Sequence, residues 1–449
     1  MFKLIANKII YAYLFIFLLL SILSLLWVRV DLYIITFSLV NVFIGVSYFI
    51  FLLILIKIGA SKEDVKIKTL VLVFWYAVFG IILYNLVFYI DHQSFLEFNS
   101  NDSMYYDKNA KKMILMPFLD SMVWMYENYP LDDWGYVVYV STIYRIFTDS
   151  NIAVNVINIF LLLWSANYLY KISNLFLTRE ISSFIVGAVS CSSIYIYYAS
   201  GGLKELLLSF VIIMIFYNYT KIASIGGVNR YLMNILQLLL WCFILIFLRP
   251  LLLVFILLSF ILGNLSRNNV NYKFSLYVIL VTLFFLYFYN DISYWISYYY
   301  RNGGYVTFSK LSGIGSYMFT YLTAIFGIIG PLPSLVFLSN ENILFVSSGL
   351  LFKSLIFIYF IIGSSFIIKN NIPLAKPMLW FVLIESVSLI MILESFELRL
   401  SMPHIALIYL ISGFGMHVHA KKSRNSNMNL YVNLSFVMIA LSTIIWSFR

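Results

Sequence analysis

The sequence predicts an all-α, polytopic integral membrane protein that forms a single transmembrane domain over residues 1–449. Hydrophobic residues make up 63% of the chain and charged residues only 11%, whereas soluble domains carry about 25% charged residues. Apolar runs of about 20 residues, the length that crosses the hydrocarbon core of a bilayer, recur from end to end. Basic and acidic residues gather in different connections between these runs, which is typical of a chain with a fixed orientation in a membrane.

The net charge of +10 does not indicate nucleic-acid binding. The basic residues stand between apolar runs, where the positive-inside rule places them on the cytoplasmic side. The first apolar run, Ile9–Leu26, has no small-residue cleavage site after it and leads directly into a second run. We therefore expect a retained first helix and not a cleaved signal peptide.

About thirteen spans are expected from the apolar runs and the alternation of loop charge. Their approximate bounds are 9–28, 33–56, 69–89, 151–170, 181–198, 205–220, 231–248, 251–265, 274–290, 344–368, 377–394, 400–418 and 429–447. The further apolar stretch 317–338 contains Gly330-Pro331, which interrupts a helix. Both of its ends are expected on the outer side, so we interpret it as a re-entrant or interfacial hairpin.

Loop charge also predicts the orientation of the spans. The connection 57–68 and the segment 421–424 are basic and are expected inside the cell. Residues 91–133 contain eight acidic and three basic residues and are expected outside. The N-terminus is therefore expected in the cytoplasm and the C-terminus on the outer face, with two outer regions at 91–150 and 291–343.

The first outer region combines carboxylates with aromatic residues. Asp102 and Tyr105 lie in one such run, and Asp132, Asp133 and Trp134 lie in the next. A carboxylate accepts a hydroxyl proton, and an aromatic ring covers the apolar face of a sugar, so the pattern favours a carbohydrate site. The alternative is a solvated acidic loop whose sign follows from topology alone.

The corner at the outer end of span 205–220 carries the adjacent opposite charges Lys204 and Glu205. Charges near the hydrocarbon core are costly, which favours a functional or paired role. The alternative is a simple helix start, in which Glu205 favours the N-terminal dipole and Lys204 extends outward to water.

Three arginines and a histidine are expected at the outer surface: Arg249, Arg301, Arg399 and His404. A guanidinium group offers a fork of donors that matches phosphate, so these residues are candidates for binding a phosphorylated substrate. The alternative is that they anchor helix ends at headgroup level.

Two ionisable residues, Lys353 and Glu385, fall within spans. Charges inside a membrane are usually paired or functional. One interpretation is a structural Lys353–Glu385 pair or a neutral Glu385, and the other is a role in proton-coupled transport.

The motifs of soluble cofactor enzymes are missing. The sequence has no phosphate-binding loop, no His/Cys metal cluster and no nucleophile elbow. Cys191 and Cys242 give neither a disulfide framework nor a metal pattern. We expect no cofactor and find no indication of a divalent metal. Any glycosyl donor would have to be lipid-linked and used on the outer face, because no cytoplasmic part is large enough for a nucleotide-sugar site.

Several of these segments resemble known membrane glycosyltransferases. The run Asp102–Ala110 is similar to the first large outer loop of GT-C glycosyltransferases, where an acidic residue shortly precedes a Tyr and an Ala. Residues 132–147 resemble the segment that follows in those proteins, although the acidic loop here comes after the third span instead of the first. The corners Gly202–Glu205, Leu248–Pro250 and Arg399–Pro403 resemble corners of GT-C-like and Wzy-type proteins of O-antigen and capsule synthesis.

The resemblance, over about residues 90–420, implies a GT-C-like fold and a function. It implies a repeat-unit polymerase for O-antigen or capsule, which uses undecaprenyl-diphosphate-linked glycan at the periplasmic face of the bacterial inner membrane. Asp102 would be the catalytic base, and Lys204, Arg249 and Arg399 would bind the lipid diphosphate. The implied partners are lipid-linked oligosaccharide, membrane lipid and a chain-length regulator. Two alternatives stay open: a GT-C transferase that adds one sugar from a polyprenyl phosphate, and a flippase or transporter for lipid-linked oligosaccharide.

Overall fold

The computed structural model describes the chain outside a set of short gaps and one long segment. The residues outside the description are 1, 28–31, 62, 97–100, 129–130, 148, 225–227, 265–340, 394–397, 423–425 and 448–449. Within the described residues every regular element is an α-helix, which confirms the all-α prediction. The expected span 274–290, the hairpin 317–338 and nearly all of the second outer region lie outside the described residues.

The helices follow the apolar runs of the sequence. They are α1 (Phe2–Trp27), α2 (Leu32–Gly59), α3 (Val65–His92), α4 (Asn101–Ile114), α5 (Phe118–Asn128), α6 (Leu131–Ile146), α7 (Asn151–Ser173), α8 (Arg179–Ser190), α9 (Ser193–Ser200), α10 (Glu205–Ser224), α11 (Val228–Leu248), α12 (Pro250–Asn264), α16 (Glu341–Lys369), α17 (Lys376–Leu393), α18 (Leu398–Lys421) and α19 (Ser426–Ser447). The first outer region, expected as a loop, contains the three helices α4, α5 and α6.

Seven described helices are long and apolar enough to cross a bilayer, which supports a multi-pass membrane protein. They are α1, α2, α3, α7, α10, α16 and α18. The expected span 181–198 is bent by 44° between α8 and α9, and counting this pair as one span gives up to eight. Three further expected spans correspond to shorter apolar helices, Leu232–Leu248, Pro250–Asn264 and Met428–Thr443.

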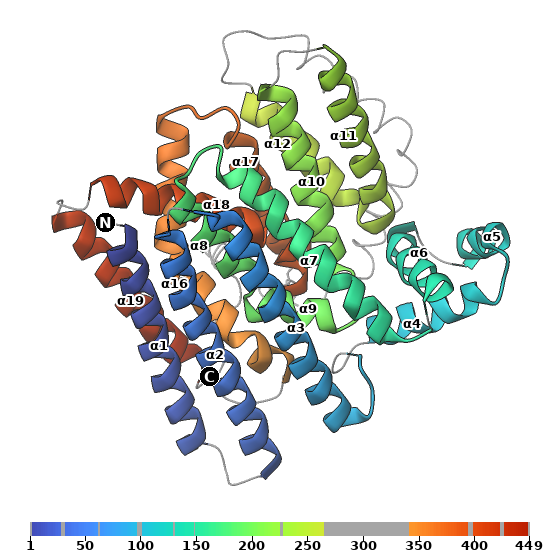
Figure 1. The fold of residues 1–449 in the computed structure, drawn as a ribbon, viewed down its shortest axis with the longest axis horizontal. Coiled ribbons are helices and arrows are strands. Elements are labelled where there is room, and N and C mark those ends of the chain that lie inside the picture. The colour runs from blue at the N-terminus through green and yellow to red at the C-terminus, as the bar shows by residue number, and fades with distance from the viewer. Residues whose placement is uncertain are drawn as a thin grey trace, which may run out of the picture.

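Helix α18 lies near the middle of the bundle (Figure 1) and packs against α8, α10, α16 and α17. The bent pair α8–α9 is buried from Ile181 of α8 to Ser200 of α9. Helices at the periphery of the bundle leave large apolar side chains exposed, such as Phe15 of α1, Trp75 of α3 and Leu240 of α11. This arrangement is typical of a bundle whose outer surface contacts lipid tails. The helices α4, α5 and α6 lie together at one edge, beyond one end of α7 (Figure 1).

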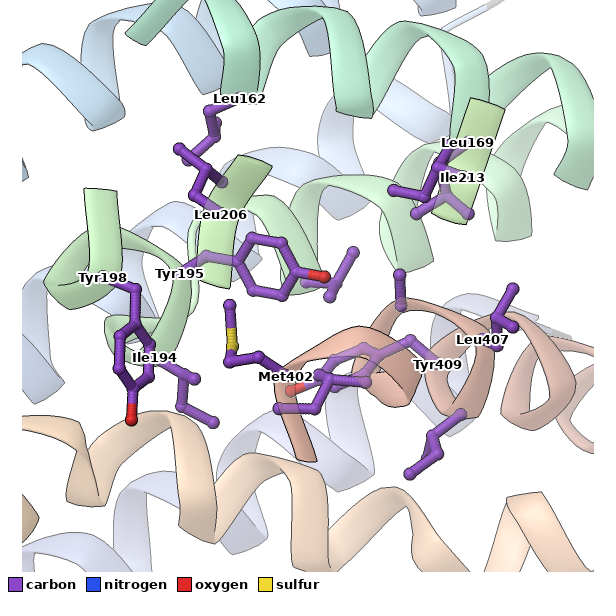
Figure 2. Packing of buried hydrophobic residues seen from close by; sticks show 14 of the residues in the cluster. Leu162, Leu169, Ile194, Tyr195, Tyr198, Leu206, Ile213, Met402, Leu407 and Tyr409 are labelled. Carbon is purple, nitrogen blue, oxygen red and sulfur yellow. The ribbon is translucent and has the colours of Figure 1, made fainter. Parts of the chain in front are cut away.

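Buried contacts around α9 fix the bend in its span. Figure 2 shows Tyr195 of α9, Leu206 of α10 and Met402 of α18 gathered between their helices. The Tyr195 hydroxyl lies 2.6 Å from the Ser209 hydroxyl of α10. The Ser193 hydroxyl donates to the carbonyl of Val346 at 3.0 Å and accepts from the amide of Gly349 at 2.8 Å. These bonds satisfy polar groups that lipid or apolar side chains would leave unpaired.

Two glycines set the distance between α16 and α18. A Cβ atom on Gly415 would overlap the backbone carbonyl of Tyr359, and one on Gly363 would overlap the carbonyl of Ile411. Small residues at helix contacts let backbones approach closely, which is the main source of packing energy between helices in a membrane.

We therefore expect Gly415→Ala to destabilise the protein by about 1–3 kcal/mol, because the added methyl meets rigid backbone. Thermal unfolding in detergent micelles measures the effect. The control is Gly413→Ala, whose Cβ would contact the ends of the Leu177 and Ile185 side chains, which are able to move. Equal unfolding temperatures for the two variants would contradict the close-packing argument.

Candidate functional site

Helix α4 presents one face to the rest of the protein. Ser103, Tyr106, Ala110 and Met113 recur at helical spacing and are all buried, and α4 packs against α6. Asp102 stands in the first turn of α4, where the helix dipole favours a carboxylate. It is partly exposed and lies one turn before Tyr106, so the candidate base is at the edge of a buried aromatic face.

A row of tyrosines joins α4 to α6, and a hydrogen bond continues it to α7. The ring centroids of Tyr106 and Tyr136 are 5.0 Å apart, and those of Tyr136 and Tyr139 are 5.6 Å apart. The Tyr139 hydroxyl donates to the Asn158 side chain of α7 at 2.9 Å. The ammonium of Lys204 lies 5.8 Å from the centre of the Tyr106 ring, a cation–π contact. The predicted residues Asp102, Tyr105 and Lys204 are therefore brought to one region.

Lys204 and Glu205 are both buried at this end of α10, with exposures of 7% and 2%. Glu205 lies in the first turn of α10, so the expected helix start is confirmed. However, the expectation that Lys204 extends outward to water is wrong, because its ammonium lies over the Tyr106 ring. One carboxylate oxygen of Glu205, Oε2, has no hydrogen-bond partner among the described residues. A buried oxygen without a partner costs about 1–3 kcal/mol and is a common feature of functional sites.

The remaining predicted aromatic residue, Trp134, lies between helices instead of facing outward. Its ring stacks on Phe247 of α11, with centroids 6.3 Å apart and an interplanar angle of 19°. Tyr126 of α5 meets it edge-on at 5.8 Å. One face of the indole is thus covered by Phe247 and not open to a sugar. Asp132 and Asp133 belong to the first turn of α6, and their side chains lie outside the description.

A second polar group is centred on Glu385 of α17. It includes Arg249, which follows Phe247 by two residues. Nδ1 of His404 in α18 lies 3.0 Å from Oε2 of Glu385, and both side chains are fully buried. Arg249, which stands between α11 and α12, lies close enough to interact electrostatically with the same carboxylate. Nε2 of His404 and Oε1 of Glu385 have no hydrogen-bond partner among the described residues.

The predicted pairing of Lys353 with Glu385 is wrong. Glu385 faces His404, and the ammonium of Lys353 in α16 has no hydrogen-bond partner within the described part of the chain. Lys353 is 1% exposed, so it is a buried amine away from the pair. Of the other predicted residues, Arg399 lies in the first turn of α18 with its side chain outside the description. Arg301 lies outside the described residues.

Sequence reasoning did not single out Asp107 or Arg145, which hold the outer helices together. The Tyr144 hydroxyl of α6 donates to Asp107 of α4 at 2.6 Å, and Lys111 makes an ion pair with the same carboxylate at 2.8 Å. Burial raises the pKa of the Tyr144 phenol well above its usual value, and the Asp107 carboxylate raises it further. The phenol therefore keeps its proton at neutral pH and donates it in this bond. The i, i+4 spacing of Asp107 and Lys111 was the only local signal.

The first polar group, Lys204 and Glu205, lies at the end of the bundle next to α4, which we call the α4–α6 end, and the Glu385–His404 pair is buried within the bundle. The helices that carry them pack in a connected series, since α6 contacts α11, α11 contacts both α10 and α12, and α17 contacts both α12 and α18. The described residues contain no group of three or more His, Cys, Asp or Glu side chains that would hold a metal ion. The two groups offer instead a buried ammonium, carboxylates, an imidazole and phenol rings.

No protein-family model matches the chain, and no curated protein is similar to its sequence. The fold defines its class as a multi-pass helical membrane protein with ionisable groups buried among its helices.

Proposed function

We propose that the chain is a membrane glycosyltransferase of GT-C-like architecture that acts on lipid-linked sugars. Within that class we propose a repeat-unit polymerase for a surface polysaccharide, either O-antigen or capsule, at the periplasmic face of a bacterial inner membrane. The observation that supports it best is a set of ionisable side chains within an apolar bundle. Lys204, Glu205, Glu385 and His404 are buried, and Arg249 is partly buried. In a membrane protein such charges are costly and are retained where they serve a reaction or a pathway.

The proposed reaction uses these groups in distinct roles. Asp102 accepts the proton of an acceptor sugar hydroxyl, whose oxygen then forms a bond to the anomeric carbon of the donor. The bond from that carbon to the diphosphate breaks, and undecaprenyl diphosphate leaves with the electron pair. Arg249 and Lys204 balance the negative charge that develops on the leaving group. Tyr105, which is partly exposed beside Tyr106, supplies apolar surface for a sugar ring.

The product of the living cell tests the function. A strain that lacks the gene is complemented with the wild-type chain, and its surface polysaccharide is separated on a gel. Restoration of a ladder of chain lengths supports a polymerase. A single increment of mass would instead identify a transferase that adds one sugar, and would overturn the polymerase.

The role of Asp102 is tested by Asp102→Asn in the same strain. The change keeps size and removes the basic carboxylate, so we expect loss of about 10²–10⁴-fold in transfer rate and a collapse of the ladder to its shortest members. The control is Asp120→Asn in α5, an exposed carboxylate of the same outer region. A full ladder from Asp102→Asn at normal protein levels would exclude Asp102 as the base.

One observation favours a second function, a flippase or transporter for lipid-linked oligosaccharide. Lys353 and the Glu385–His404 pair are buried inside the helical bundle, as expected of groups along a transport path. Transport and polymerisation leave different products in a deletion strain. Loss of transport leaves lipid-linked units in the cytoplasmic leaflet, whereas loss of polymerisation leaves them, as single units, on the outer side.

A further inference from the structure

Helix α5 carries its apolar side chains on the outside of the protein. Leu119, Val123 and Tyr126 recur at i, i+4 and i+7 and are 75%, 56% and 75% exposed. Leu115, in the turn before the helix, is 85% exposed. The opposite face is the buried one, with Ser121 and Met125 against the protein. An exposed apolar stripe of this kind on an ordered helix requires an apolar neighbour.

The helix is held firmly in this orientation. The Arg145 guanidinium of α6 donates to the carbonyls of Met113 and Met116, which end α4, and it lies 3.5 Å from the Ser121 hydroxyl of α5. It thereby satisfies carbonyls that a helix end leaves unpaired. The Arg145 side chain therefore fixes the corner between α4 and α5 and holds α5 with its apolar stripe facing outward.

Charged side chains flank the apolar stripe on α5 and are also exposed on α4. Asp120 and Glu127 are exposed on the side of α5 next to the stripe, and Lys108, Lys111 and Lys112 are exposed on α4. The Lys112 ammonium lies 5.8 Å from the centre of the Trp124 ring. An apolar stripe, flanking charges and Trp and Tyr side chains are the pattern of a helix that lies in a membrane–water interface.

The two helices that flank the α4–α6 region in the sequence have exposed apolar surfaces next to it. The region α4–α6 is inserted between α3 and α7, two of the helices able to cross a bilayer. At the ends that adjoin the insertion, Ile90 of α3 and Ile152 of α7 are 71% and 47% exposed, so the apolar surface continues up to the inserted helices. The 11 residues of α5 extend over about 16 Å, too short to cross a hydrocarbon core of about 30 Å.

We propose that α5, with Leu115, is an interfacial anchor whose apolar stripe lies in the headgroup–acyl boundary of the phospholipid leaflet at the α4–α6 end. The partner is the bilayer itself and not a protein. Through the Arg145 corner the anchor sets the height of α4, and hence of Asp102, relative to the membrane surface. The anchor rests on the exposed stripe, on the charges beside it and on the apolar ends of α3 and α7, and it does not depend on the proposed function.

Site-directed spin labelling tests the anchor. Cys191 and Cys242 are replaced by Ala, and single labels are placed through Leu119→Cys, Val123→Cys and Asn128→Cys. Asn128 is the control, because it is exposed and lies on the side of α5 away from the stripe. The full-length protein is reconstituted in nanodiscs of phosphatidylcholine and phosphatidylglycerol. Power-saturation spectra then measure the access of oxygen, which concentrates in the acyl region, and of a water-soluble nickel chelate.

We expect labels at 119 and 123 to favour oxygen over the nickel chelate and the label at 128 to show the reverse order. Equal nickel access at all three positions would mean a solvated helix and would overturn the proposal. Exclusion of both reagents at 119 and 123 would mean that protein covers the stripe, either another segment of this chain or a partner, and would overturn it as well. Circular dichroism and gel filtration of each labelled protein verify the fold.

Discussion

Arg249→Ala is expected to lower the rate of polymer formation by about 10²–10³-fold, the effect of removing one donor that stabilises charge in a transition state. Arg249 stands between α11 and α12, where its amide donates to the carbonyl of Leu245 at 2.8 Å and its carbonyl accepts from Leu252 at 3.1 Å. The backbone there is fixed by the two helices, so the guanidinium is presented from a rigid corner. The rate is measured in proteoliposomes supplied with lipid-linked repeat units.

Two further variants separate the charge of Arg249 from its shape. Arg249→Lys keeps the positive charge and loses the planar fork, so we expect it to recover part of the lost rate. Arg179→Ala removes an exposed arginine from the first turn of α8 and is expected to polymerise at the wild-type rate. Wild-type polymerisation by Arg249→Ala would remove this arginine from the proposed site. Thermal unfolding of each variant separates a lost reaction from a lost fold.

The spans were predictable because a single quantity, the length of an apolar run, determines them. The expected span 205–220 lies within α10 (Glu205–Ser224), and 344–368 lies within α16 (Glu341–Lys369). The bend in 181–198 was not predicted, because no Gly or Pro stands at the break. Ser192 caps α9 there, and its hydroxyl accepts from the Tyr195 amide at 3.4 Å. A serine inside an apolar run has the same appearance whether its helix continues or restarts.

The candidate site was predictable in its residues and not in its pairings. The sequence identified four candidates because an ionisable group in an apolar background costs free energy. They are Lys204, Arg249, Glu385 and His404. Which of them meet depends on how α11, α12, α17 and α18 pack, and sequence spacing does not encode this. The sequence therefore offered a Lys353–Glu385 pair as one interpretation, whereas His404 is the residue that faces Glu385.

Similarly, the helices in residues 91–150 were not predicted, because the sequence was interpreted there through its charge alone. The buried positions of α4, from Ser103 to Met113, do recur at helical spacing. The acidic and basic residues between them obscured that period in the sequence. Only the contact between α4 and α6 gives the face a partner, and the same contact places Asp102 beside the tyrosine row.

Removal of both Glu385 and His404 is expected to lower the free energy of unfolding by less than the sum of the two single removals. Each of Glu385→Ala and His404→Ala leaves the remaining polar group buried without its partner, and we expect each to lower the free energy of unfolding by about 3–5 kcal/mol. The double variant leaves neither group, so its loss should be smaller than the sum by about 0.5–3 kcal/mol. The free energies are measured by titration with sodium dodecyl sulfate in mixed micelles.

Glu180→Ala, which removes an exposed carboxylate of α8, is the control and should change stability little. Additive losses would show that the 3.0 Å approach of the two side chains carries no coupling energy, and Glu385 would then need another explanation for its place inside the bundle.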